Sequence, residues 1–241
     1  AIDLPYFWVT TLNSTGANNN AFGSNCLSSN TTGQHNVAIG TSSLQYNTTG
    51  EFNTSVGTST LNVNSSGGSN VAFGHAALLS NTTASVNTAI GTSALRLNTT
   101  GTENTAVGAG AIDVNTTGQG NTAVGRDALG ANTTASSNTA VGKSALGANT
   151  TGANNVAVGA SALDANTTAS NNIIGTEALE TNVTGIYNIA IGTQTLEDNT
   201  ASSNVAIGNA ALRVNTTGQQ NTAIGGGALD ANTTANFNVA I

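Results

Sequence analysis

Apolar residues return along this chain with a period of seventeen residues. One apolar position lies in a short motif of the general form Asn-x-Ala-(Val/Ile/Phe)-Gly, and a second, nearly always leucine, follows four residues after the motif glycine. A polar run rich in Asn, Thr and Gly separates each leucine from the next motif. A short fixed period is the signature of a repeat architecture, so it governs the rest of the interpretation. The motif glycines are Gly23, Gly40, Gly57, Gly74, Gly91, Gly108, Gly125, Gly142, Gly159, Gly175, Gly192, Gly208 and Gly225.

Within the motif, alternation of side chains predicts a short β-strand. In residues 36–40, Val37 and Ile39 share one face and Ala38 lies on the other. We expect the face with the larger side chains to be buried together with the leucines. Helix is disfavoured because Asn, Thr and Gly rank low in helix propensity, and because helical repeats need units of about 33 to 47 residues.

The polar run between leucine and motif is predicted to be a turn. The steps from Gly159 to Gly175 and from Gly192 to Gly208 are one residue short, and the second contains a cut Asn-Thr-Thr run at residues 199–201. One missing residue in a paired strand would move every side chain to the other face, whereas a loop absorbs it. We expect the asparagine of each run to stack on its equivalents as a ladder, and each motif glycine to adopt a positive φ or a close backbone approach.

One such unit buries too little surface to offset its own ordering entropy, but stacked units share a continuous core. The sequence therefore predicts an all-β fold, a parallel β-solenoid (β-roll or β-helix) of about 13 turns of 17 residues over residues 17–241. Residues 1–16 are predicted to form an N-terminal arm or cap, that is, an assembly segment. The residues predicted to take part in assembly are Pro5, Tyr6, Phe7, Trp8, Val239 and Ile241.

Composition excludes several classes of partner. Only 6% of residues are charged and the net charge is −7, so no basic patch exists for phosphate contacts, and we expect no nucleic acid partner. No apolar run is long enough to cross a bilayer, so we expect no membrane insertion of this segment. Cys26, the one cysteine, occupies a position that is Ala or Ser in most other repeats and is interpreted as a small filler. We expect no cofactor.

Fourteen Asn-x-Ser/Thr sequons occur, and most of them recur once per turn in the predicted loop. Two interpretations stay open: a row of glycans along one edge, or simple turn chemistry, which the Asn-Thr-Thr sequence supplies by itself. Besides Asn13 and Asn53, the candidate glycosylation residues are Asn30, Asn47, Asn64, Asn81, Asn98, Asn115, Asn132, Asn149, Asn166, Asn182, Asn215 and Asn232.

Aspartates and histidines do not form a recognisable metal motif. Asp113, Asp164 and Asp230 share one phase of the repeat but lie several turns apart and lack the dense acidic spacing of calcium loops. His35 and His75 fall at different phases and are predicted to face solvent. We expect no metal site.

The nearest approach to a carboxylate cluster is formed by Glu177, Glu180, Glu197 and Asp198. Clustered carboxylates in differing environments are what a polysaccharide-cleaving solenoid needs. We interpret these four as solvated loop charges. The sequence thus predicts no catalytic residues and no enzyme.

The segment Asn-Thr-Ala-Ile-Gly-Thr-Ser-Ala-Leu-Arg-Leu-Asn-Thr-Thr-Gly at residues 87–101 resembles the tandem units of bacteriophage tail-fibre and related surface proteins. The Asn-Val-Ala-Ile-Gly core is also similar to the head repeats of trimeric autotransporter adhesins. The resemblance covers residues 17–241 and implies a parallel β-roll, commonly three chains side by side, in a stiff rod. It implies an extracellular, cell-surface or virion location.

We expect a structural subunit of an extracellular filament or fibre that assembles by head-to-tail stacking of solenoids, with surface adhesion as an added role. Its expected partners are further copies of itself, forming a homo-oligomer or polymer, and cell-surface glycans. The alternative is a receptor-binding or adhesive tail-fibre shaft, which glycan binding by this segment would favour.

A second alternative is an ice-binding solenoid, because regular rows of Thr and Asn on a flat face can order water. Thr88, Thr105, Thr122 and Thr139 share one phase, but valine or isoleucine occupies that phase in other turns. We interpret this exchange as the mark of an inward-pointing position, which disfavours ice binding. The apolar members are Val37, Val71, Val156 and Ile189.

Overall fold

The computed structural model describes residues 15–241, and in this part of the chain the only regular elements are short parallel strands, with no helix. They form a β-solenoid of about 13 turns, which confirms the predicted fold class. The strands are β1 (Asn20–Phe22), β2 (Val37–Ile39), β3 (Thr54–Val56), β4 (Val71–Phe73), β5 (Thr88–Ile90), β6 (Thr105–Val107), β7 (Thr122–Val124), β8 (Thr139–Val141), β9 (Val156–Val158), β10 (Asn172–Ile174), β11 (Ile189–Ile191), β12 (Val205–Ile207), β13 (Thr222–Ile224) and β14 (Val239–Ala240).

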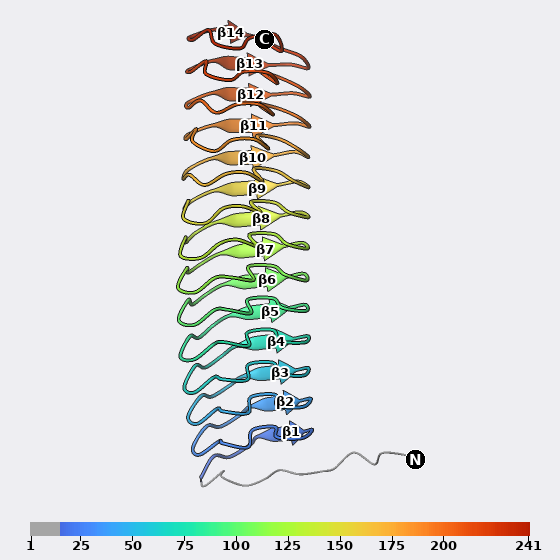
Figure 1. Ribbon diagram of the computed structural model, residues 1–241, viewed down its shortest axis with the longest axis vertical. Helices are drawn as coiled ribbons and strands as arrows, with labels where there is room; N and C mark the ends of the chain where they lie inside the picture. The colour runs from blue at the N-terminus through green and yellow to red at the C-terminus, as the bar shows by residue number, and fades with distance from the viewer. Residues whose placement is uncertain (1–14) are drawn as a thin grey trace, which may run out of the picture. The chain divides into compact units, whose positions relative to one another are not determined.

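The chain divides into two compact units, residues 1–120 (unit 1) and residues 121–241 (unit 2). Unit 1 contains β1 to β6 and unit 2 contains β7 to β14. Within each unit, each strand pairs in parallel with the strand of the next turn (Figure 1), so that Val37 lies opposite Thr54 in unit 1 and Val205 lies opposite Thr222 in unit 2. Equivalent repeat positions therefore stack on one another.

The two shortened turns lose their residue in the Asn-Thr-Thr corner, as predicted. Strand register is unchanged beside both, with Val156 opposite Asn172 and Ile189 opposite Val205. In a full turn the corner asparagine donates from Nδ2 to the carbonyl three residues on, whereas Asn166 donates to the carbonyl of Thr168, two residues on, at 2.7 Å. The corner therefore accommodates the missing residue, and the strand pairing in the sheet is unaffected.

The interior of each turn is narrow and half polar. Six residues per turn point inward: the central strand alanine, the third and fourth residues after the glycine, two asparagines, and the small residue at the end of the Asn-Thr-Thr corner. In the turn that contains β5 these are Asn87, Ala89, Ala94, Leu95, Asn98 and Gly101, all of them buried. Leucine is the only large side chain in this set, so the stacked leucines form the apolar core.

The predicted orientation of the strands was wrong. Ala38 is fully buried while Ile39 is 41% exposed and Val37 is partly exposed, and the central residue is likewise buried in β3 to β13. The alternation itself is as expected. The side chains point the other way because leucine and two asparagines already fill the interior, which leaves room for only a methyl group beneath most strands.

The buried asparagines form two ladders that run along the stack in each unit. In the first, the corner asparagine donates from Nδ2 to Oδ1 of its equivalent one turn earlier, as Asn64 does to Asn47 at 2.7 Å. In the second, the asparagine before the strand accepts at Oδ1 from the backbone nitrogen of its equivalent, as Asn53 does from Asn70 at 3.0 Å. The amides also donate to backbone carbonyls of the corners, as Asn64 does to Gly67 and Asn70 does to Ala84, so apart from Oδ1 of Asn149 these buried polar groups are paired in the part of the chain that the structure describes. The predicted ladder is confirmed, and a second accompanies it.

The motif glycines occupy the corner after each strand with a positive φ, as predicted. Gly91 has φ +136°, and a Cβ built on it would lie 2.5 Å from the carbonyl oxygen of Gly108 in the next turn. A real Cβ has no room there, so the corner requires glycine for both conformation and space.

Leucine also adopts a left-handed backbone conformation, which the sequence did not signal. Leu44 has φ +50° and Leu95 has φ +51°, and the equivalent residue repeats this in the other full turns. Such a conformation is unfavourable for a residue with a Cβ. It persists because the side chain is fully buried and because the amide of Leu95 donates to Ala111 at 3.0 Å.

Candidate functional site

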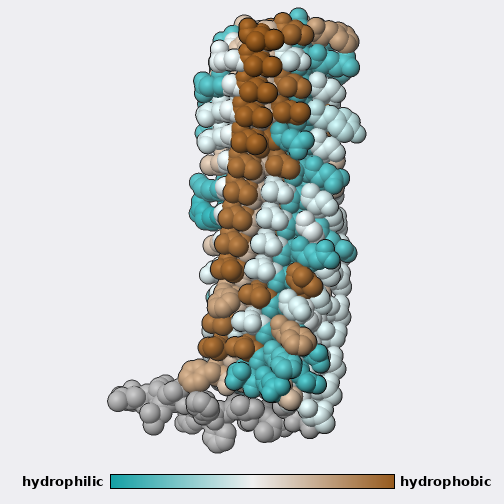
Figure 2. Space-filling view, turned by 180° about the vertical axis from the view of Figure 1, so that it is seen from behind, coloured by the Kyte–Doolittle hydropathy of each residue, from teal (hydrophilic) through white to brown (hydrophobic). Residues whose placement is uncertain are grey.

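The outward side chains of the strands form the largest regular surface of the solenoid, which we call the strand face. It consists of the first and third residue of each strand, on either side of the buried central residue. The third position is always apolar and forms a continuous column, brown and in places tan, in each unit of Figure 2. Its members are Phe22, Ile39, Val56, Phe73, Ile90 and Val107 in unit 1, and Val124, Val141, Val158, Ile174, Ile191, Ile207 and Ile224 in unit 2.

This column is too exposed to belong to the core. Ile90 in unit 1 is 41% exposed, and Ile174 in unit 2 is 48% exposed. Single exposed apolar side chains are ordinary on soluble proteins, but a contiguous apolar strip marks an interaction surface. The strand face is therefore the candidate functional site, and sequence reasoning placed its residues inside.

The first position of each strand forms a second, mixed column on the same face. It holds Thr, Val, Asn or Ile, and Thr88 and Thr105 in unit 1 are partly exposed, as are Thr122 and Thr139 in unit 2. The interpretation of this phase as inward-pointing was wrong for the same reason as above. Threonine and valine exchange here because both fit a flat, half-exposed strand surface.

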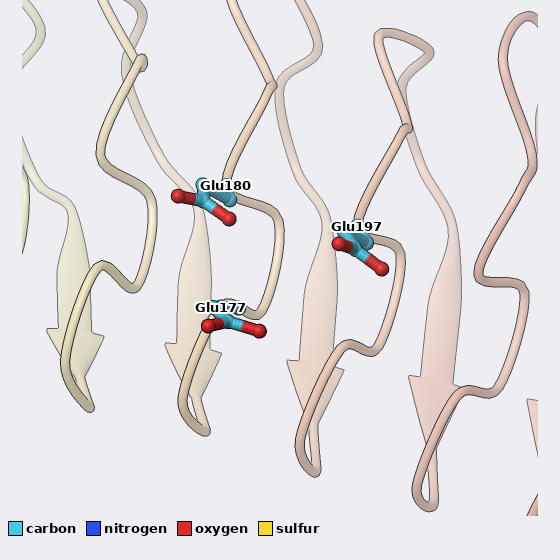
Figure 3. Close-up of side chains that lie close together, drawn as sticks. All are labelled: Glu177, Glu180 and Glu197. Carbon is cyan, nitrogen blue, oxygen red and sulfur yellow. The ribbon is translucent and has the colours of Figure 1, made fainter.

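Three of the four clustered acidic residues do lie together. One carboxylate oxygen each from Glu177, Glu180 and Glu197 falls within 4.8 Å of the others, and all three residues are half-buried. Figure 3 shows them on neighbouring turns, after β10 and after β11, with their carboxylates on the same side. Oxygen donors of this kind suit a hard cation, but among the residues that the structure describes no further His, Cys, Asp or Glu joins the set. Glu177 accepts a hydrogen bond from Gln194 at 3.2 Å.

Mutual repulsion affects the ionisation of this cluster. Partial burial, and then the negative charges of Glu177, Asp164 and Glu197, raise the pKa of the Glu180 carboxyl above its ordinary value. Burial also raises the pKa of Asp164, against a hydrogen bond from the backbone of Gly147. Of the four residues predicted to be solvated loop charges, Asp198 is exposed, whereas the three glutamates are half-buried.

Replacing Glu180 by glutamine is expected to stabilise unit 2 at neutral pH. A carboxyl whose pKa is raised by folding contributes stability below its unfolded pKa and loses that contribution as the pH rises through the folded pKa. Stability should therefore fall as the pH rises from about 4 towards 7. Glu180→Gln should reduce this fall by less than about 1 kcal/mol, since solvent screens half-exposed charges. Thermal unfolding measured from pH 4 to pH 7 checks the effect.

The matched control is Glu103→Gln, which removes one negative charge from an exposed position in unit 1. If the control flattens the pH dependence as much as Glu180→Gln does, the effect comes from net charge and not from the cluster.

The burial of the sequon asparagines disfavours the glycan row. Asn47, Asn81 and Asn98 are fully buried, and each donates both from its amide to Oδ1 of another asparagine and to a backbone carbonyl. A glycan on that nitrogen would replace a ladder hydrogen bond and would have no space. Asn232, in the last turn, is half-buried but makes the same two bonds. Turn chemistry is the interpretation that the geometry supports. The other predicted glycosylation residues that are buried are Asn30, Asn53, Asn64, Asn115, Asn132, Asn149, Asn166, Asn182 and Asn215.

The structure also describes the surroundings of the cysteine and of the two histidines. Cys26 is buried, donates from Sγ to the carbonyl of Gly40 at 2.7 Å, and has its pKa raised by burial, which fits a filler. His35 and His75 are exposed, as predicted, and the ring of His35 stacks on Phe52 with centroids 5.0 Å apart.

The remaining predicted residues lie apart from one another. Asp113 pairs with Arg96 one turn away at 2.8 Å. Val239 and Ile241 are 73% and 93% exposed in the last turn. The aromatic segment at residues 5–8 lies outside the described residues, as does Asn13. The part of the chain that the structure describes has no helix that could cross a lipid bilayer.

Comparison of the chain with family models, with curated proteins and with solved structures finds no match.

Proposed function

We propose that this chain is a structural subunit of an extracellular fibre whose copies associate side by side along their strand faces. The observation that carries the proposal is the apolar column at the third strand position. In unit 2 it passes through the seven strands from β7 to β13, spaced about 4.8 Å apart, which gives an apolar strip of roughly 30 Å. A second copy of the same strip is a self-complementary partner for it.

The remaining composition of the strand face supports the same partner. None of the strand residues is Lys, Arg, Asp or Glu, so two faces can approach without burying a charge. The mixed column, at the first position of each strand, adds small Thr and Val side chains, which allow close packing. Regular stacking places equivalent residues at equal intervals, so copies in register match along the whole unit.

Head-to-tail stacking and surface adhesion remain predictions, as does a role as a tail-fibre shaft. Head-to-tail stacking depends on how residues 5–8, Val239 and Ile241 contact a neighbouring copy. Adhesion and the tail-fibre role depend on a ligand. The absence of enzymatic activity and the extracellular location are likewise proposals that follow from the repeat class.

Sedimentation equilibrium of the purified chain tests the proposal. We expect a mass that is a multiple of the monomer's 23.6 kDa at micromolar concentration. The combined change Ile174→Lys, Ile191→Lys and Ile207→Lys should shift the mass to that of the monomer, because three lysines on the strand face of unit 2 would have to be desolvated. These side chains point outward, so the fold should survive.

The control places the same three charges on another surface. Thr134, Thr151 and Thr217 are exposed in the Asn-Thr-Thr corners of unit 2, and their change to lysine should leave the assembly intact. A wild-type chain that stays monomeric, or an assembly that survives lysines on the strand face, would remove the basis of the proposal.

Ice binding is the second candidate, and the outward orientation of the Thr and Val column is the observation that now favours it. The column is interrupted by Asn20 in unit 1 and by Asn172 in unit 2, and Phe22 and Phe73 protrude beside it in unit 1, which disrupts a regular lattice of water sites. If a monomeric wild-type chain shows thermal hysteresis and the triple lysine variant does not, the strand face binds ice and not a second copy.

A further inference from the structure

The two shortened turns interrupt the corner asparagine ladder of unit 2. The corner asparagines Asn149, Asn182, Asn215 and Asn232 each donate to their equivalent one turn earlier, as Asn149 does to Asn132 at 3.2 Å and Asn215 does to Asn199 at 2.7 Å. Asn166 and Asn199, in the shortened turns, instead donate to the carbonyls of Thr168 and Ala201 within their own corners. Both side chains still accept a ladder hydrogen bond at Oδ1 from the next turn, so only the bond to the previous turn is missing.

The interruption leaves a buried polar atom without a partner. Oδ1 of Asn149 is buried and accepts no hydrogen bond, because Asn166 does not reach it. At the second interruption, Oδ1 of Asn182 accepts from the backbone of Gly185 in its own turn at 2.9 Å. A buried, unpaired amide oxygen is costly, and such atoms are rare in folded proteins.

The other connections between these turns are intact. The leucine rung continues through Leu163, whose amide donates to Ala178 at 3.0 Å, and the second ladder continues from Asn155 to Asn171 at 3.0 Å. Strand pairing between β9 and β10 and between β10 and β11 is in register. The defect is therefore confined to one corner of the cross-section.

Repulsive charge lies beside the same corners. Glu180 is two residues before Asn182 and Glu197 is two residues before Asn199, and the two carboxylates are within 4.8 Å of each other. The gap in the ladder and the repulsion between the carboxylates act on the same turns. Because like charges repel, the repulsion favours any movement that separates the two carboxylates.

We propose that the two breaks in the corner ladder, between Asn149 and Asn166 and between Asn182 and Asn199, form a built-in opening point, at which unit 2 exposes its interior while its strands stay paired. An opening here releases the unpaired Asn149 oxygen to water and separates the glutamates. An opening between other turns of unit 2 would break existing hydrogen bonds of the corner ladder. This device is independent of what the strand face binds.

Amide hydrogen exchange followed by NMR on the intact chain tests the proposal. The backbone nitrogens of Asn166 and Asn182 donate to the leucine carbonyl three residues earlier at 3.2 and 3.3 Å, and Asn81 and Asn98 in unit 1 make the same bond at 3.2 Å. This backbone hydrogen bond is thus matched, and what differs is the corner ladder together with the neighbouring carboxylates. We expect exchange at Asn166 and Asn182 to be about tenfold or more faster than at Asn81 and Asn98.

A repaired variant supplies the control. A serine inserted after Ser170 and a threonine inserted after Thr200 give both corners the sequence Asn-Thr-Thr-Ala-Ser-Ser-Asn found at residues 132–138. Exchange at Asn166 and Asn182 should then slow by about the same tenfold. Equal exchange at all four positions in the wild-type chain, or fast exchange that persists after repair, would overturn the proposal.

Discussion

Gly91→Ala is expected to destabilise the protein by about 3 to 6 kcal/mol, because it combines an unfavourable φ with a backbone collision. Gly91 has φ +136°, and the added Cβ would meet the carbonyl of Gly108 at 2.5 Å. Relief requires the next turn to move away, which breaks the strand pairing between β5 and β6. Chemical denaturation with the loss of β-sheet circular dichroism checks the magnitude.

Two glycines in one turn separate the two causes. Gly225 has φ +124° but no atom within 4 Å of its added Cβ, and Gly226 has open space beyond 3.9 Å and no positive φ. Gly225→Ala should show the strain alone, about 1 to 3 kcal/mol, and Gly226→Ala should be nearly neutral. A Gly91→Ala variant as stable as Gly226→Ala would contradict the stacked geometry of the corners.

Asn81→Leu is expected to cost about 3 to 5 kcal/mol, although leucine has a similar size and is more hydrophobic. Asn81 donates to Oδ1 of Asn64 at 2.8 Å and to the carbonyl of Ala84 at 3.0 Å, and it accepts from Asn98 at 3.1 Å. The substitution leaves buried partners unpaired on both sides. Denaturant unfolding measures the loss.

Thr83→Ala is the control for this corner, since Thr83 is exposed two residues away. Its effect should stay within about 0.5 kcal/mol. If Asn81→Leu proves neutral or stabilising, the ladder does not hold the corner and the interior tolerates an apolar replacement.

The period of the sequence was sufficient to predict the parallel solenoid, the polar corner and the first asparagine ladder. Repetition carries this information, because equivalent residues must stack if each turn is one unit. The two one-residue deletions were informative for the same reason: a strand could not absorb them, and Asn166 shows how a corner does.

The direction of the strands could not be read from hydrophobicity. Ala38 and Ile39 are both apolar, and the larger one is the usual choice for a core, yet it is the smaller one that is buried. The signal that was available is the uniform size of one position: the central residue is Ala in nearly every strand, while its neighbours vary among Thr, Val, Ile, Phe and Asn. A narrow interior restricts size, and a surface does not. Leucine in a left-handed conformation had no such signal, since the residue type disfavours it.

The central claim is that each repeat is one rung, with alanine, leucine and asparagine inside and the larger strand residues outside. A density map of the protein at side-chain resolution tests it most directly. In that map we expect Gly57, Gly74 and Gly91 to line up about 4.8 Å apart, with Ala89 facing the leucines and Ile90 facing away from them. A map with Ile90 packed against Leu95, or with the three glycines out of line, would contradict it.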